Sequence, residues 1–174
     1  IDPDQVAVGG HSAGGWTSLH TAFMDQAEIQ EVCPGCGAGS DYLSEQLPEV
    51  SGIQAVFPMS GALLDADWIE QEESDIDVMV LHGTHDGVVH YGEEPVYPCC
   101  NTYQTPIDGA CPITERLALV GSNYYLLSGD GYGHDIFESG YIEVNQEQLL
   151  WFLGQSLFSD QDFARHSVVT RSQA

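Results

Sequence analysis

The chain has 174 residues, enough for one domain with a modest core, and its 43% of hydrophobic residues is ordinary for a globular protein. Its charge is not ordinary, because 27 acidic residues stand against three arginines and no lysine, for a formal net charge of −24. This charge argues against nucleic acid, anionic membrane surfaces and anionic substrates as partners, and no apolar run is long enough for a membrane span.

The first predicted elements are a buried strand over 5–9 and an amphipathic helix over 13–27. The turn between them reads Gly10-His11-Ser12-Ala13-Gly14. It fits the G-x-S-x-G pattern, in which a strained turn requires small residues two positions before and two after the serine. We expect this turn to lift the Ser12 hydroxyl clear of the sheet and to direct the backbone N–H of Ala13 at a developing oxyanion.

The rest of the chain alternates strands and helices, which is typical of an α/β fold. After a loop or lid region come predicted strands and helices in turn: loop 28–51, strand 53–57, a short acidic helix 66–72, strand 77–82, helix 113–120 closed by Gly121, strand 123–127 and helix 142–158. Residues 91–112 are predicted to form an irregular insert. The last helix should turn four leucines toward the core, namely Leu149, Leu150, Leu153 and Leu157. We expect one domain over 1–158, followed by a polar tail over 159–174.

Two loops after predicted strands supply an acid and a base. Asp86 follows the third strand in the segment His82-Gly83-Thr84-His85-Asp86, and His134 follows the fourth between glycines. A serine hydroxyl is a poor nucleophile at neutral pH and needs an adjacent base. In this interpretation His134 takes the proton of Ser12, and Asp86 holds the imidazole in the right tautomer. His82, at the end of its strand, is expected to orient a loop.

Three segments, in this order, resemble the α/β-hydrolase family and in particular its secreted esterases and lipases. They are 2–15 with the serine turn, 78–89 with the acid loop, and 124–134 with the histidine loop. The resemblance implies the C-terminal half of an α/β-hydrolase sheet, with mostly parallel strands and flanking helices. It also implies the chain order nucleophile, acid and base, which assigns Ser12, Asp86 and His134 to a catalytic triad.

Several residues leave alternatives open around this triad. Asp65 and Asp67 are rival acids, because some relatives take the acid from the preceding strand, but the flanking His-Gly-Thr favours Asp86. His11, inside the turn, is expected to pack beside the sheet. Together with His85 it is a candidate for contact with the substrate.

Five cysteines lie in loop-like stretches, which favours disulfides in an oxidising compartment: Cys33, Cys36, Cys99, Cys100 and Cys111. With the acidity, this predicts a secreted protein. The C-x-x-C spacing at the first two cysteines leaves a zinc site as an alternative. No histidine spacing typical of a metal site is present, so we expect neither a metal nor another cofactor.

A whole α/β-hydrolase places about four more strands ahead of the nucleophile strand. We therefore expect the chain to be the C-terminal part of a longer precursor, with an absent N-terminal half or another chain at the edge of strand 5–9. The predicted function is hydrolysis of small neutral carboxylic esters through an acyl-enzyme on Ser12, with the pocket shaped by 28–51 and 91–112. The alternatives are a prolyl-oligopeptidase-like peptidase and a non-catalytic remnant that serves as an interaction or structural module.

Overall fold

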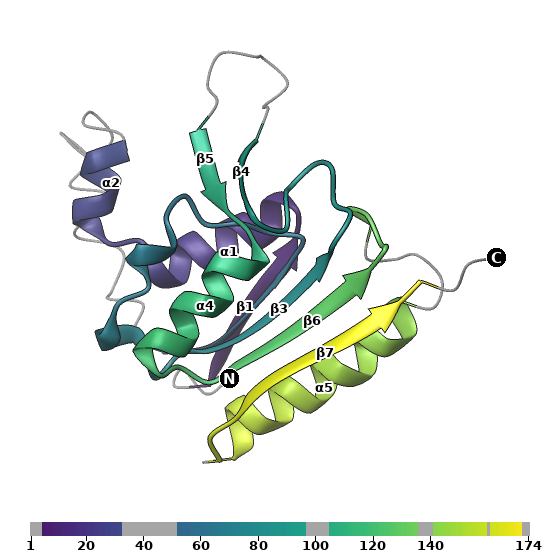
Figure 1. Ribbon diagram of the computed structural model, residues 1–174. Helices are drawn as coiled ribbons and strands as arrows, with labels where there is room; N and C mark the ends of the chain where they lie inside the picture. The colour runs from purple at the N-terminus through teal and green to yellow at the C-terminus, as the bar shows by residue number, and fades with distance from the viewer. Residues whose placement is uncertain (1–4, 33–51, 97–104, 136–140, 160, 172–174) are drawn as a thin grey trace.

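The protein is a five-stranded sheet with helices on both faces (Figure 1). The computed structural model describes residues 5–32, 52–96, 105–135, 141–159 and 161–171. The sheet runs in the order β1-β2-β3-β6-β7, and every neighbouring pair is parallel. Its strands are β1 (Val6–His11), β2 (Ile53–Met59), β3 (Asp77–Gly83), β6 (Tyr124–Asp130) and β7 (Ala164–Thr170). The predicted α/β class with parallel strands is confirmed.

Side chains alternate across the sheet and divide the core into two layers. Val78 and Val80 of β3 pack with α1 (Ala13–Phe23) and α4 (Ala110–Val120), whereas Met79 and Leu81 pack on the opposite face with α5 (Ile142–Phe158). All four side chains are almost fully buried. Strands buried on both faces need continuous apolar runs, which is why β3 was recognisable from the sequence.

The helices follow the predicted boundaries with three exceptions, of which one is that α4 begins at Ala110 although the helix was expected over 113–120. The helix expected over 13–27 is divided into α1 and α2 (Gln26–Val32), because Met24 is extended and the Asp25 side chain accepts hydrogen bonds from two N–H groups at the start of α2. The short helix expected over 66–72 is two 3₁₀ turns, η1 (Ala66–Trp68) and η2 (Gln71–Glu73).

The sequence predictions for α4 and α5 meet different outcomes. In α4 the predicted apolar face is buried, and Gly121 ends the helix with a left-handed φ of 83°. In α5, three of the four leucines contact the core, but Leu150 is 73% exposed and the prediction for it is wrong. Phe152, fully buried, takes the inward position instead.

The predicted irregular insert over 91–112 contains regular structure. Here β4 (Glu93–Val96) and β5 (Thr105–Asp108) form an antiparallel pair, and α4 begins at Ala110. This strand pair is not predicted from the sequence because both strands contain a proline, a residue that is expected at sheet edges and in loops. Cys111 also lies in α4 rather than in a loop, and it is a free thiol that contacts Glu115. The other four cysteines, like most of the loop 28–51, lie outside the described residues.

The predicted polar tail over 159–174 is also wrong, because residues Ala164–Thr170 form β7. This strand pairs with β6 along its whole length, from Tyr124 opposite Ala164 to Asp130 opposite Thr170. Its side chains are mostly exposed, so it lacks the apolar run by which a buried strand is recognised.

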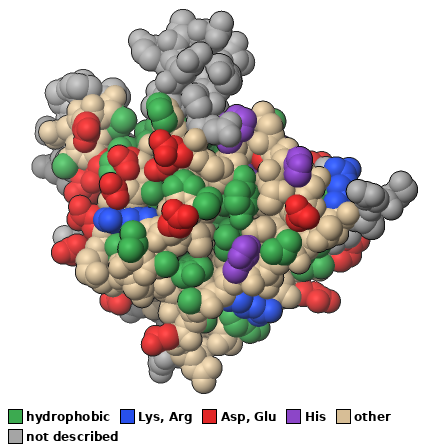
Figure 2. Space-filling view, in the orientation of Figure 1, with side chains coloured by type: hydrophobic (Ala, Val, Ile, Leu, Met, Phe, Trp, Pro, Cys, Tyr) green, Lys and Arg blue, Asp and Glu red, His purple; other side chains and the backbone are tan. Residues whose placement is uncertain are grey.

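The surface and the sheet edges agree with two other expectations. Figure 2 shows many acidic side chains and few basic ones on the viewed face, as the composition requires. Within the described sheet, β1 lies at one edge and β7 at the other. No helix among the described residues is long and apolar enough to cross a bilayer.

Candidate active site

The turn that carries the serine joins β1 to α1 and has an unusual backbone. Ser12 adopts φ 56° and ψ −118°, a conformation that is strained for an L-residue. Its N–H donates to the carbonyl of Met59 on β2 (2.8 Å), and the N–H of Trp16 donates to the Ser12 carbonyl (3.0 Å). The predicted sharp turn from strand to helix is therefore confirmed.

Glycines allow the backbone segments around this turn to pass closely. A Cβ on Gly10 would stand 2.7 Å from the carbonyl carbon of Gly14, and one on Gly15 would stand 3.0 Å from Cα of Gly61, after β2. The requirement for a small residue is thus confirmed at Gly10. A Cβ on Gly14 would meet no atom within 4 Å, so that position is less constrained than the pattern suggested.

The structure brings Ser12, His134 and Asp86 into one hydrogen-bonded chain. Nε2 of His134 lies 2.8 Å from Oγ of Ser12, and Nδ1 of His134 lies 2.7 Å from Oδ2 of Asp86. A carboxylate only accepts, so Nδ1 carries the imidazole proton and Nε2 offers its lone pair to the hydroxyl. The residues follow β1, β6 and β3, and the carboxyl ends of parallel strands lie at the same edge of the sheet.

Asp86 is buried, at 4% exposure, and is surrounded by donors. Burial alone would raise its pKa, but hydrogen bonds from His82, His134 and the N–H groups of Val88 and Val89 hold the pKa of this carboxyl well below its usual range. Oδ1 accepts from the two backbone groups at 2.8 and 2.9 Å, and Oδ2 lies close to both histidines. A permanently ionised carboxylate can stabilise an imidazolium at His134.

Two further side chains fix the backbone of the histidine loop. The carbonyl of His134 accepts from Nε2 of His11 (2.8 Å) and from the hydroxyl of Ser60 (3.1 Å). Ser60 is fully buried just after β2 and also has a positive φ, 48°. Sequence reasoning missed Ser60, although its place after an apolar strand at the same sheet edge was a usable signal.

The structure gives His11 and His85 different surroundings. The ring centroids of His11 and His134 are 5.0 Å apart, so the two side chains are neighbours. Contact between His11 and a substrate stays a prediction. His85 is exposed, with Nδ1 3.1 Å from the hydroxyl of Thr84. Ala13 is the first residue of α1, so its N–H is one of the helix N-terminal donors that have no partner within the helix. Its role in an oxyanion hole also stays a prediction.

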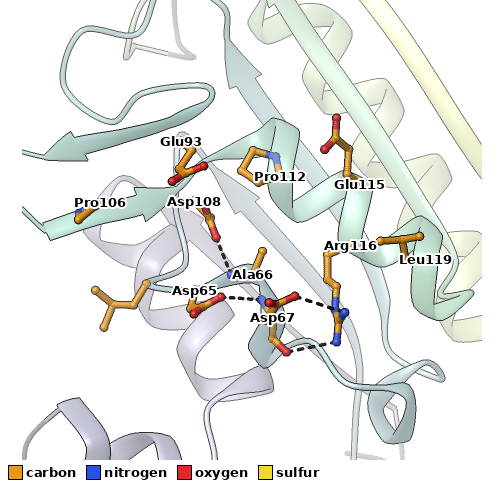
Figure 3. A pocket seen from close by; sticks show the side chains of 11 residues that line it. Asp65, Ala66, Asp67, Glu93, Pro106, Asp108, Pro112, Glu115, Arg116 and Leu119 are labelled. Atoms are coloured by element: carbon orange, nitrogen blue, oxygen red, sulfur yellow. Dashed lines mark hydrogen bonds and ion pairs between the residues drawn. The ribbon is translucent and has the colours of Figure 1, made fainter.

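The rival acids are occupied elsewhere, in a cavity of about 490 Å³ that is lined by several carboxylates (Figure 3). The Asp65 side chain accepts from the N–H of Asp67, and the Asp67 carboxylate pairs with Arg116 at 3.3 Å. Only Asp86 lies within hydrogen-bond distance of the His134 ring among the described acidic residues. The preference for Asp86 over these two residues therefore agrees with the geometry.

Within the described residues no three histidine, cysteine or acidic side chains are grouped so that they could hold a metal ion. A serine hydroxyl hydrogen-bonded to an imidazole, which in turn donates to a buried carboxylate, is the arrangement that activates serine for acyl transfer.

Comparison with protein-family models and with curated proteins gave no match. Among solved structures, the chain is similar to a puromycin-hydrolyzing peptidase of Mycobacterium tuberculosis, with a TM-score of 0.49 and 20% sequence identity. The alignment covers 98% of this chain and 24% of that one, so the present chain spans a minor part of the length of that peptidase. A likeness of this size assigns neither a family nor an activity.

Proposed function

We propose that this chain carries the catalytic residues of a serine hydrolase that cleaves carboxylic esters. The observation that supports the proposal most is the continuous chain from Ser12 Oγ through His134 to Asp86, with both hydrogen bonds shorter than 3 Å. The strained backbone at Ser12 supports it further, because strain of this kind accumulates at sites where a reactive group is held in place.

The residues divide the reaction between them. Oγ of Ser12 attacks the ester carbonyl carbon while Nε2 of His134 takes the hydroxyl proton, and Asp86 stabilises the resulting imidazolium. The N–H of Ala13 faces the oxyanion. When the tetrahedral intermediate collapses, His134 returns the proton to the leaving alcohol and an acyl-enzyme remains. Water then repeats the sequence, and the carboxylic acid leaves.

The substrate is proposed to be small and neutral. With a net charge of −24, the protein repels anionic molecules, so esters without a charged group have the easiest approach. The same acidity suits a secreted protein, because extracellular salt screens self-repulsion. We also propose that the edge of β1 is covered by a preceding segment of a longer chain or by another chain, since a free edge strand invites association.

Intact-mass labelling with a fluorophosphonate probe tests the proposal. The expected result is a single adduct on the chain that is lost in Ser12→Ala and retained in Asp65→Asn, the control for a carboxylate outside the triad. Hydrolysis of p-nitrophenyl esters but not of peptide anilides is expected to follow the same pattern. A folded wild-type chain that forms no adduct, alone or with the preceding segment added, contradicts the proposal and favours the non-catalytic module. Faster cleavage of the anilides identifies a peptidase.

A further inference from the structure

Asp86 contacts a second histidine that the proposed reaction does not use. His82 lies at the end of β3, four residues before Asp86, and none of its surface is exposed. Its Nε2 is 2.9 Å from the carbonyl oxygen of Val89 and 3.2 Å from Oδ2 of Asp86. One ring nitrogen therefore contacts both the Asp86 side chain and the backbone carbonyl of Val89 in the loop that supplies the acid.

These contacts determine the tautomer of His82. The carbonyl of Val89 and the carboxylate of Asp86 are both acceptors, so Nε2 must carry a proton. Nδ1 is buried and has no hydrogen-bond partner among the described residues. A proton on Nδ1 would therefore be a buried donor without an acceptor among the described residues, which is costly. The ring of Tyr91 lies edge-on to it, with centroids 5.6 Å apart.

We propose that His82 is a positioning residue for the acid: its Nε2–H holds Oδ2 of Asp86 where that oxygen meets Nδ1 of His134. This proposal deepens the proposed function and rests on it. The two carboxylate oxygens have different partners, since Oδ1 is held by the N–H groups of Val88 and Val89. Oδ2 is held by side chains alone. Without His82, only His134 among the described residues would contact that oxygen.

The two contacts of His82 act on two different parts of the acid loop. The hydrogen bond from Nε2 of His82 to the Val89 carbonyl fixes the backbone after Asp86, and the contact of the same Nε2–H with Oδ2 at 3.2 Å fixes the Asp86 side chain. The hydrogen bond from His82 contributes to holding the pKa of Asp86 low, along with that from His134. His82 touches neither Ser12 nor the space where an ester carbonyl meets it, so its effect passes through Asp86.

The test compares His82→Gln, which keeps an N–H donor, with His82→Met, which fills similar space without one. We expect His82→Met to lower kcat for ester hydrolysis, and the rate of fluorophosphonate labelling, by about 10- to 100-fold, with little change in KM. His82→Gln should recover most of that loss. Leu117→Ala, a buried change in α4 away from the site, is the control for destabilisation alone and should leave the kcat of folded protein unchanged.

A folded His82→Met variant with the wild-type kcat overturns the proposal, as does equal loss in the Met and Gln variants. A second measurement needs no variant and no activity. Nitrogen-15 histidine NMR on the wild-type chain should show Nε2 of His82 protonated and Nδ1 unprotonated, and a proton on Nδ1 instead overturns the proposal. If this tautomer is found but Ser12 does not react with the probe, the proposed function fails while the contact between His82 and Asp86 stands.

Discussion

The two ends of β3 each carry a buried aspartate, and the two carboxyls are treated in opposite ways. Asp86, beyond the carboxyl end, is 4% exposed, and its pKa is held well below the usual range. Asp77, at the amino end, is 8% exposed, and burial raises its pKa. Burial is similar at both ends, so it does not account for the difference.

The difference comes from the neighbours of each carboxyl. Asp86 has two histidines and two backbone N–H groups as donors. Asp77 receives a hydrogen bond from the side chain of Asn123 at 3.0 Å, and the carboxylates of Asp75 and Asp162 repel its charge. The surroundings of Asp86 therefore favour its ionised form, whereas those of Asp77 disfavour it. This is the contrast expected if Asp86 has a functional role and Asp77 has none.

The largest effect is expected for a substitution at Asp86, whose ionised form is stabilised by the surrounding donors. Asp86→Asn places an amide opposite Nδ1 of His134 and so selects the wrong tautomer, which should lower kcat on the order of 10⁴-fold. Because the pKa of Asp86 is lowered by folding, its contribution to stability is present above its unfolded value and is lost as the pH falls. The difference in the free energy of unfolding between wild type and variant, measured by urea titration, should therefore narrow in acid. A difference that is constant with pH contradicts this.

The next largest effect is expected on removing Asn123, the hydrogen-bond donor to Asp77 at the amino end of β3. Asn123→Ala leaves Asp77 with one fewer hydrogen bond and also deletes the acceptor for the N–H of Phe163. We expect a loss of about 2 kcal/mol in the free energy of unfolding at neutral pH. In a double-mutant cycle, Asp77→Asn should recover part of the loss, because the variant no longer buries a charge. Strict additivity of the two changes would show that the contact is unimportant.

A smaller effect of opposite sign is expected when Asp77 alone is neutralised. Asp77→Asn keeps an acceptor for Asn123 and removes the buried charge, so it should raise the free energy of unfolding at neutral pH by up to about 1 kcal/mol. The pKa of Asp77 is raised by folding, so its favourable contribution exists below the unfolded value and is lost as the pH rises through the folded value. The gain in the variant should therefore vanish in acid. If Asp77→Asn is less stable than wild type at neutral pH, the charge of Asp77 is stabilising, and Asp77 and Asp86 do not differ in the way described.

The smallest effect of the four is a dependence on salt. Raising NaCl from millimolar to molar levels should raise Tm, because ions screen the repulsion among the excess carboxylates. The increase should be smaller in Asp77→Asn, which lacks one of three crowded carboxylates at that end of β3. Calorimetry at several salt concentrations measures both. A Tm that is flat or falls with salt would show that self-repulsion is minor.

The elements that the sequence predicts best are those in which burial or close packing restricts each position to a few residue types. The apolar runs of β2, β3 and β6, and the serine turn with its glycines, were predicted because burial and close backbone approach restrict which residues can stand there. The three triad positions follow directly from such runs.

What could not be predicted depends on contacts between distant segments. β7 was missed because an exposed edge strand needs no apolar run, and its pairing with β6 is non-local. Ser60 and His11 act on the carbonyl of His134, more than 70 residues away, and no spacing records such a bond. The exposure of Leu150 depends on which side of α5 meets the sheet, and that is settled by Phe152.

The position of β1 has a consequence for how activity should fail on heating. In the described sheet Ser12 follows an edge strand with one neighbour, whereas Asp86 and His134 follow β3 and β6, each with two. Local opening can release an edge strand at lower free energy than global unfolding. In the chain by itself, with the edge of β1 uncovered, fraying of β1 would carry Ser12 away from His134 and Asp86 while those two side chains still contact each other. Amide hydrogen exchange should accordingly find the first cooperative unit to open in β1, and reactivity should disappear before the core melts.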